Sequence, residues 1–191
     1  MEWTVERDYA REALPKRDPE GHKGTFGEVL ALAGSVGYTG AAWLAAEGAV
    51  RGGCGLVHLG VPEDIWPVEA VKCTSAMPFP LAAEDGGLSL RALEGIREKL
   101  ARCDVLALGP GLGRRAETAE LIRRLLSETE KPAVLDADGI NALAGHIDIL
   151  DGRRGRVTVL TPHEGEFARI GDLSGGRVQA ARNFAVAHGC W

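Results

Sequence analysis

The sequence predicts an open, mostly parallel α/β sheet flanked by helices, and three observations carry that prediction. Three short apolar runs, at residues 105–109, 133–135 and 157–161, each end in a loop of glycines and polar residues. A helical pattern follows each run, and strands alternating with helices at this spacing form parallel sheets. Each run is apolar at successive positions, as is typical of strands buried on both faces. Because ligands bind at the carboxyl ends of such strands, the three loops predict one composite site.

Apolar spacing and chain breakers predict the elements of the first half of the chain. Apolar residues recur at helical spacing over residues 1–14, Val5 and Tyr9 among them, which predicts a short leading helix. Thr39 is a candidate cap for a helix made largely of alanine and glycine. In order, the predicted elements are a strand over 28–33, a helix over 41–51, a strand over 55–61 and a helix over 63–71.

The second half alternates the three apolar runs with amphipathic helices. The predicted helices cover residues 89–101, 115–128 and 176–188. In the middle one, an apolar stripe is expected to face the sheet, formed by Leu121, Ile122, Leu125 and Leu126. Glu120 and Arg124 are spaced for an ion pair on its exposed side.

Composition predicts a single domain over residues 1–191 and bears on the partners it could have. The net charge of −5, without a basic stripe, argues against nucleic-acid and membrane partners. No stretch is apolar enough to span a bilayer, and the N-terminus is too polar for a signal peptide. The four cysteines form no Cys-x-x-Cys pair, which argues against a zinc site and favours a cytoplasmic protein. His58, on a strand pattern, is predicted to be structural.

The loop Gly-Pro-Gly-Leu-Gly at residues 109–113 directly precedes a predicted helix. Glycines let backbone N–H groups approach a ligand, and a helix N-terminus favours an anion. A tight strand-to-helix turn explains the same residues, and spacing alone leaves both interpretations open. The loop matches neither the dinucleotide fingerprint nor a Walker A sequence.

The loop at residues 136–141 places two carboxylates and an amide at a strand end. Asp136, directly after the strand, is the candidate site residue, able to bind ribose hydroxyls, a water or Mg²⁺ indirectly. For Asp138 the favoured interpretation is a cap on the following helix.

The loop at residues 161–166 puts an imidazole beside two carboxylates. Helix capping accounts for Thr161, Pro162 and Glu164 but leaves His163 unexplained. His163 is therefore a candidate to donate to a ligand or to move a proton near neutral pH.

Six motifs, taken in order, resemble the ADP- or ATP-dependent NAD(P)H-hydrate dehydratases over roughly residues 20–190. Each motif is weakly specific, but the ordered set is strongly so. It comprises His-Lys-Gly-Thr-Phe-Gly (22–27), Ala-Gly-Ser-Val-Gly-Tyr-Thr-Gly-Ala-Ala (33–42), Arg-Gly-Gly-Cys-Gly-Leu-Val (51–57), the glycine loop (109–113), Leu-Asp-Ala-Asp-Gly-Ile-Asn (135–141) and Leu-Thr-Pro-His-Glu-Gly-Glu-Phe (160–167).

The resemblance implies a ribokinase-like fold and repair of hydrated NADH or NADPH, coupled to hydrolysis of ADP or ATP. The implied chemistry is phosphorylation of the hydrate's hydroxyl followed by elimination, with Mg²⁺ accompanying the nucleotide. The family often forms oligomers, so homo-oligomerisation is also expected. At matching positions, the implied contacts with the hydrated nucleotide are Ala41, Gly111 or Gly113, and His163, with Asp136 and Asn141 lining the same pocket.

The resemblance also implies segments that this sequence does not contain. In the family, a Lys-Gly-x-x-Thr strand and a Gly-Ser-Gly-Asp loop follow the helix matching 176–188, and the expected catalytic aspartate would lie beyond Trp191. The expectation is therefore a C-terminally truncated domain whose activity alone is in doubt. A fragment, a chain completed by another polypeptide and a non-catalytic nucleotide-binding remnant all stay open. A ribokinase-like kinase of small alcohols is a further alternative, disfavoured by the segments at 34–40 and 161–166.

Overall fold

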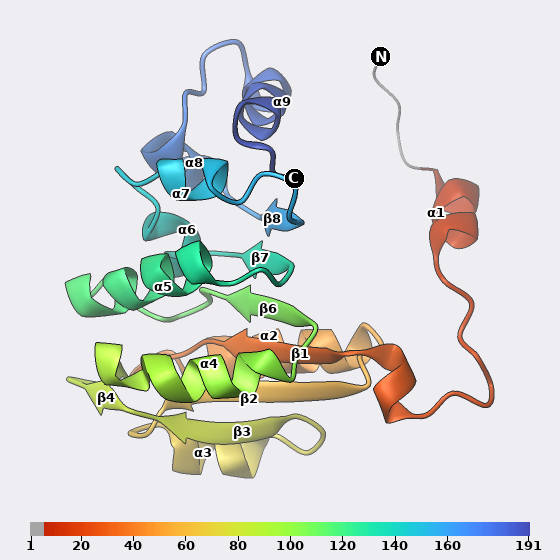
Figure 1. Ribbon diagram of the computed structural model, residues 1–191, viewed down its shortest axis with the longest axis vertical. Helices are drawn as coiled ribbons and strands as arrows, with labels where there is room; N and C mark the ends of the chain where they lie inside the picture. Colours follow the sequence, from red (N-terminus) through yellow and green to blue (C-terminus); the bar gives the residue numbers. More distant parts are fainter. Residues whose placement is uncertain (1–5) are drawn as a thin grey trace.

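A six-stranded parallel sheet forms the centre of the protein, in the computed structural model that describes residues 6–191 (Figure 1). Its strand order is β3-β2-β1-β6-β7-β8, and each neighbouring pair is parallel. The predicted α/β fold class is thus confirmed. The strands are β1 (Glu28–Leu32), β2 (Leu56–Pro62), β3 (Met77–Leu81), β6 (Val105–Leu108), β7 (Ala133–Leu135) and β8 (Thr158–Leu160).

Helices cover both faces of the sheet. In Figure 1, α4 (Leu93–Ala101) and α5 (Ala116–Glu128) lie in front of it, and α2 (Thr39–Arg51) and α3 (Trp66–Lys72) lie behind it. The chain also forms α1 (Arg7–Ala13), α6 (Asp138–Asn141), α7 (Asp148–Asp151), α8 (Glu164–Ile170), α9 (Arg177–His188) and two 3-10 turns, η1 (Lys23–Phe26) and η2 (Leu90–Ala92). None of the helices among residues 6–191 has the length and apolarity needed to cross a bilayer.

The side chains of β1 point alternately to the two faces of the sheet, and each face has its own hydrophobic core. Leu30 and Leu32 belong to the larger core beneath α4 and α5. Ala31 and Ala33 point to the other face and pack with Ala42 and Ala46 of α2. Small side chains on both partners let α2 lie close to the sheet, which accounts for the alanine-rich composition of that helix.

Most predicted elements are confirmed, with shifts at their ends. The leading helix forms over Arg7–Ala13, while Val5 lies outside the described residues. The predicted stripe of α5 is buried, and its Glu120–Arg124 ion pair forms at 2.8 Å. Hydrogen bonds from Arg124 and Arg123 lower the pKa of Glu120.

The prediction that Thr39 caps α2 is wrong. Tyr38 occupies the cap position without a side-chain cap bond, and Thr39 is the first helical residue. The Thr39 hydroxyl instead accepts a hydrogen bond from Lys72 Nζ at 2.7 Å. The side chain therefore joins α2 to α3 rather than satisfying the helix end.

Two features were not predicted from the sequence: the edge strand β3, and the hairpin of β4 (Ala83–Glu84) and β5 (Gly87–Leu88). Pro78 and Pro80 interrupt β3, and proline in a short run argues against a strand. Proline is tolerated in β3 because this strand lies at the edge of the sheet, where one side of the strand has no neighbouring strand to hydrogen-bond. At the other edge, Trp191 donates its N–H to Thr158 and accepts from Leu160, beside β8.

Glu69 of α3 is a buried carboxylate with incomplete hydrogen bonding. Its side chain is fully buried, and Oε1 lies 3.5 Å from Lys72 Nζ. Oε2 has no partner within residues 6–191. Burial raises the pKa of Glu69, and the Lys72 ammonium offsets only part of this effect.

Glu69→Gln should change the pH dependence of stability. Because the folded-state pKa of Glu69 is raised, wild type gains stability relative to the variant as pH falls through that pKa. The difference in unfolding free energy should thus favour the variant more at neutral than at mildly acidic pH, measured by urea unfolding. Glu94→Gln, at an exposed carboxylate, is the control. A difference independent of pH would contradict the effect assigned to burial.

Candidate functional site

The loops after β1 and β6 are tied together at the carboxyl edge of the sheet. Gly34 donates its N–H to the carbonyl of Pro110 at 2.8 Å. Ser35 donates its hydroxyl to the carbonyl of Gly111 at 2.7 Å. These two bonds bring the loop after β1, which was not one of the three loops predicted to form the site, beside the loop after β6.

Ala41 and Gly111 meet where these loops touch. A Cβ at Gly111 would lie 2.8 Å from Ala41 Cβ and 2.9 Å from Tyr38 Cβ. Gly111 also has a φ of +67°, which side chains rarely adopt. Both the spacing and the backbone conformation thus require glycine at position 111.

Gly113 and Asn141 are linked through Asp138. Gly113 donates its N–H to Asp138 Oδ2 at 2.9 Å, and Asn141 donates its amide to Oδ1 at 3.1 Å. Arg169 of α8 extends the network by donating to Asn141 Oδ1 at 3.0 Å. The favoured interpretation of Asp138 as a cap is wrong, since α6 has no side-chain cap bond. Asp138 instead holds the glycine loop against α6.

Asp136, the candidate site residue after β7, links two strand-end loops. In the described structure its Oδ1 accepts the hydroxyl of Thr161 at 2.9 Å, joining the loops after β7 and β8. Ala137, between the two aspartates, has a φ of +48°, which is unfavourable for a residue with a side chain. This strained turn lets neighbouring carboxylates reach different loops.

His163 is the N-cap of α8. The interpretation that Thr161 and Pro162 begin this helix is therefore wrong, and capping accounts for His163 itself. Its Nδ1 accepts from the N–H groups of Gly165 at 3.0 Å and Glu166 at 3.3 Å. Its Nε2 lies 3.1 Å from Glu166 Oε1. Both ring nitrogens are thus engaged, in a side chain that is 67% exposed. A ligand would meet the face and edge of the ring.

A pocket of about 150 Å³ lies between the β6 loop, α6 and α8, lined by Gly113, Arg114, Ala119, Asp138, Asn141, Ala142 and Arg169. Two guanidinium groups beside one carboxylate favour an anion such as a phosphate. The volume is below the 300 Å³ or so of a typical small-molecule site, so the pocket suits part of a nucleotide.

The pocket separates the predicted site residues into two groups. Gly113 and Asn141 line it, whereas Ala41, Gly111, Asp136 and His163 lie on the surrounding loops and helix ends. Sequence reasoning missed Arg114 and Arg169, which lie outside any glycine or carboxylate motif. The only sequence signals for them are that Arg114 directly follows Gly113 and that Arg169 lies on the helix that follows His163.

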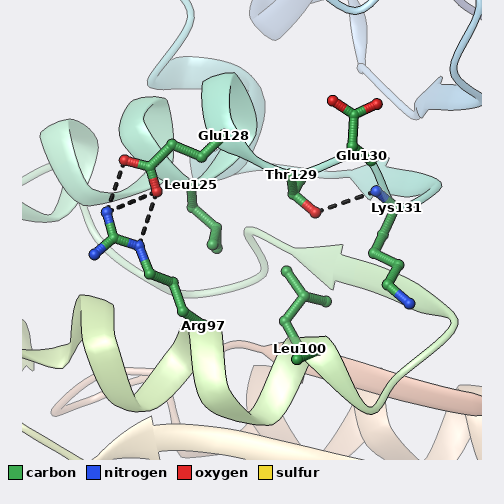
Figure 2. Close-up of a pocket in the computed structure, with 8 residues that line it drawn as sticks. Arg97, Leu100, Leu125, Glu128, Thr129, Glu130 and Lys131 are labelled. Carbon is green, nitrogen blue, oxygen red and sulfur yellow. Dashed lines mark hydrogen bonds and ion pairs between the residues drawn. The ribbon is translucent and has the colours of Figure 1, made fainter.

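Figure 2 shows a second pocket, of about 320 Å³, between α4 and α5. Arg97 binds both carboxylate oxygens of Glu128, while Leu100 and Leu125 line the pocket. Lys131, also in the lining, precedes β7 and so marks the amino edge of the sheet. This pocket contains none of the predicted site residues and lies away from the strand-end loops.

Sequence comparisons match this chain to one group of proteins. A family model described as NAD(P)H-hydrate dehydratase matches residues 29–190. The chain is 45% identical over 175 residues to the bifunctional NAD(P)H-hydrate repair enzyme of Moorella thermoacetica, covering 91% of this chain and 33% of that protein. It is 36% identical over 171 residues to the ADP-dependent (S)-NAD(P)H-hydrate dehydratase of Neisseria meningitidis serogroup B, covering 89% and 54%. The chain thus spans about a third to a half of these relatives.

Structural comparisons agree on the fold. A ribokinase-like superfamily protein from Enterococcus faecalis superposes with a TM-score of 0.80 at 19% identity, over 97% of this chain and 63% of that one. An ADP/ATP-dependent NAD(P)H-hydrate dehydratase from Bacillus subtilis, co-crystallised with ATP and Mg²⁺, gives 0.66 at 26% identity, over 96% and 62%. The first likeness supports the ribokinase-like architecture alone.

Proposed function

The chain belongs to the NAD(P)H-hydrate dehydratase family, and from this premise we propose that its strand-end loops bind a hydrated nicotinamide nucleotide. The proposed reaction is dehydration of (S)-NAD(P)H hydrate to NAD(P)H, coupled to hydrolysis of ADP or ATP. The close packing at Gly111 supports this proposal, because Ala41 and Tyr38 leave no room there for a side chain and a loop of glycines can hold a ligand through its backbone N–H groups.

The pocket beside these loops supports the same ligand. Arg114 and Arg169 supply positive charge for a phosphate, and Asn141 supplies an amide within the same lining. His163 presents an exposed ring on the neighbouring helix end. The proposed arrangement places a phosphate in the pocket and the hydrated ring along the glycine loop.

The proposed chemistry balances as two steps. The hydrate's hydroxyl attacks the terminal phosphoryl group of ADP or ATP, releasing AMP or ADP and the hydroxyl proton. Elimination then breaks the carbon–oxygen bond, releases inorganic phosphate and a ring proton, and restores the dihydropyridine. The described residues orient the hydrate in this scheme, and we assign none of them as the general base.

Mg²⁺ is expected with the adenine nucleotide, but the loop carboxylates do not form a site for it. Both carboxylate oxygens of Asp138 accept hydrogen bonds within the loops, and Asp136 accepts one from the Thr161 hydroxyl. Within residues 6–191, no group of three metal-binding side chains gathers at this edge. The proposed ligands of Mg²⁺ are therefore the nucleotide phosphates.

His163→Ala and His163→Asn together test the proposed ligand contact. His163→Ala removes the helix cap and the ring, whereas asparagine is a good N-cap and removes only the ring. We expect both variants to bind NADH hydrate about tenfold more weakly, a loss of about 1.4 kcal/mol. Only the alanine variant should lose about 1 kcal/mol of folding stability.

Titration calorimetry and urea unfolding measure these two quantities separately. If the asparagine variant binds NADH hydrate as tightly as wild type, His163 acts only as a helix cap. Recovery of reduced-cofactor absorbance with ADP or ATP and Mg²⁺ tests turnover in the same samples. Binding without turnover would support the nucleotide-binding alternative over the enzyme.

A further inference from the structure

Three side chains with metal-binding atoms meet at the amino edge of the sheet, opposite the strand-end loops. They are Glu28 at the start of β1, His58 in β2 and Cys103 just before β6. His58 Nε2 lies 3.2 Å from Glu28 Oε2. One donor atom from each residue lies within 4.8 Å of the others.

The parallel register explains this meeting of distant residues. Glu28 pairs with Leu56, so His58, two residues further along β2, points to the same face of the sheet. Val29 pairs with Val105, which brings the chain before β6 beside the start of β1. Cys103 then lies under the end of α4, where its thiol donates to the carbonyl of Lys99 at 3.3 Å.

The cluster is sheltered on one side and open on the other. Cys103 is fully buried, whereas the side chains of His58 and Glu28 are 13% and 24% exposed. A cation could therefore reach the thiol past the imidazole and the carboxylate. Water would remain available as a further ligand from the same side.

We propose that Glu28, His58 and Cys103 bind a thiophilic divalent cation of the Zn²⁺ class. Sulfur, imidazole and carboxylate are the ligands that zinc takes in proteins, and three of them plus water complete a tetrahedron. Zinc–ligand distances of about 2.0 to 2.3 Å put donor atoms roughly 3.3 to 3.8 Å apart. The His58–Glu28 spacing of 3.2 Å fits, and the thiol needs a movement of about 1 Å at most.

Binding would displace the thiol proton, so that Cys103 releases one H⁺ as its sulfur bonds the cation. Burial and the Glu28 carboxylate raise the pKa of the Cys103 thiol, so the metal-free thiol is protonated at neutral pH. A divalent cation would compensate the charge of the carboxylate and of the thiolate. Lys99 and Lys131 lower the pKa of the Cys103 thiol and so offset part of this rise, whereas Asp104 adds to it.

Cysteine spacing along the sequence does not mark this cluster, because zinc motifs of that kind pair cysteines that are close in sequence. Here a single cysteine is joined by a histidine and a glutamate from neighbouring strands. His58 would then be a metal ligand rather than only the ion-pair partner of Glu28. A bound cation would link the amino ends of β1, β2 and β6.

Titration of the full chain with Co²⁺, followed by Zn²⁺, tests the proposal. We expect one equivalent of Co²⁺ to produce thiolate-to-cobalt charge-transfer absorption and the visible bands of a tetrahedral site, and Zn²⁺ to abolish both. Cys103→Ser should lose the charge-transfer absorption, and His58→Gln should weaken Co²⁺ binding at least tenfold. Cys73→Ser, at a half-buried thiol after α3, is the matched control and should behave as wild type.

Thermal unfolding supplies a second measurement. Zn²⁺ should raise the Tm of wild type and Cys73→Ser but not of Cys103→Ser or His58→Gln. Absence of charge-transfer absorption in wild type would overturn the proposal, as would its persistence in Cys103→Ser. If Cys103→Ser fails to fold, unchanged Co²⁺ spectra and affinity in both His58→Gln and Glu28→Gln would overturn it equally.

Discussion

Arg153→Met is expected to lower the free energy of unfolding by at least about 3 kcal/mol. Arg153 is 1% exposed and donates to the Thr158 hydroxyl at 3.0 Å. It also donates to the carbonyls of Leu126, Thr129 and Lys131 at 2.8–2.9 Å. Methionine fills similar length but leaves these buried acceptors without a donor, and unsatisfied buried groups are costly.

The position of these acceptors explains why the effect should be global. They lie at the end of α5, in the loop before β7 and in β8, so one guanidinium joins two layers of the fold. Burial lowers the pKa of Arg153, yet a guanidinium remains protonated in proteins. Within the described part of the chain, the charge is therefore balanced by carbonyl dipoles instead of a direct carboxylate partner.

Urea unfolding of Arg153→Met beside Arg124→Met measures the effect. Arg124 is half exposed and its partner is Glu120, so its loss should cost less than about 1 kcal/mol. Equal destabilisation by the two variants would show that the buried hydrogen bonds of Arg153 contribute little. Ligand binding at the strand-end loops should persist in Arg153→Met under conditions in which it is folded.

Gly109→Ala is expected to destabilise the chain by about 3 kcal/mol or more and to abolish binding of NADH hydrate. A Cβ at position 109 would lie 1.8 Å from the Asp136 carbonyl oxygen and 2.7 Å from Gly139 N. Gly109 also has a φ of +130°, which strains any residue with a side chain. The loops after β6 and β7 would have to separate, and they carry the proposed site.

Gly145→Ala is the control that separates the cost of backbone strain from the cost of a steric collision. Gly145 has a φ of +77°, but an added Cβ there would meet no atom within 4 Å. Its substitution should cost about 1 kcal/mol and leave ligand binding unchanged. Urea unfolding and calorimetry on both variants check this, and a similar small cost for Gly109→Ala would contradict the close packing of the two loops.

The apolar runs were sufficient to predict the central strands, because burial on both faces leaves a continuous pattern. The same logic missed β3, since Pro78 and Pro80 are tolerated only through its place at the edge of the sheet. The position of a strand within the sheet depends on tertiary structure, which the local sequence does not encode. The cap predicted for α2 failed for a related reason, because the Thr39 hydroxyl bonds Lys72 of α3 instead of the helix end.

The site was predictable as a set of loops but not as a network. Glycine and carboxylate motifs located Gly111, Gly113 and Asp136 at strand ends. The link from Gly113 through Asp138 to Asn141 depends on contacts between separate loops. Arg169 lies 28 residues from Asn141, and no local pattern marks it as part of the pocket.

Direct binding of NADH hydrate to the chain tests the central claim, that the interlocked strand-end loops hold a hydrated nicotinamide nucleotide. Calorimetric titration should show one site that prefers NADH hydrate over NADH in wild type and in Gly145→Val. Gly111→Val should lose that binding, because its side chain would collide with Ala41 and Tyr38. Equal binding of the hydrate by Gly111→Val and Gly145→Val, or no binding by the folded wild-type chain, would contradict the claim.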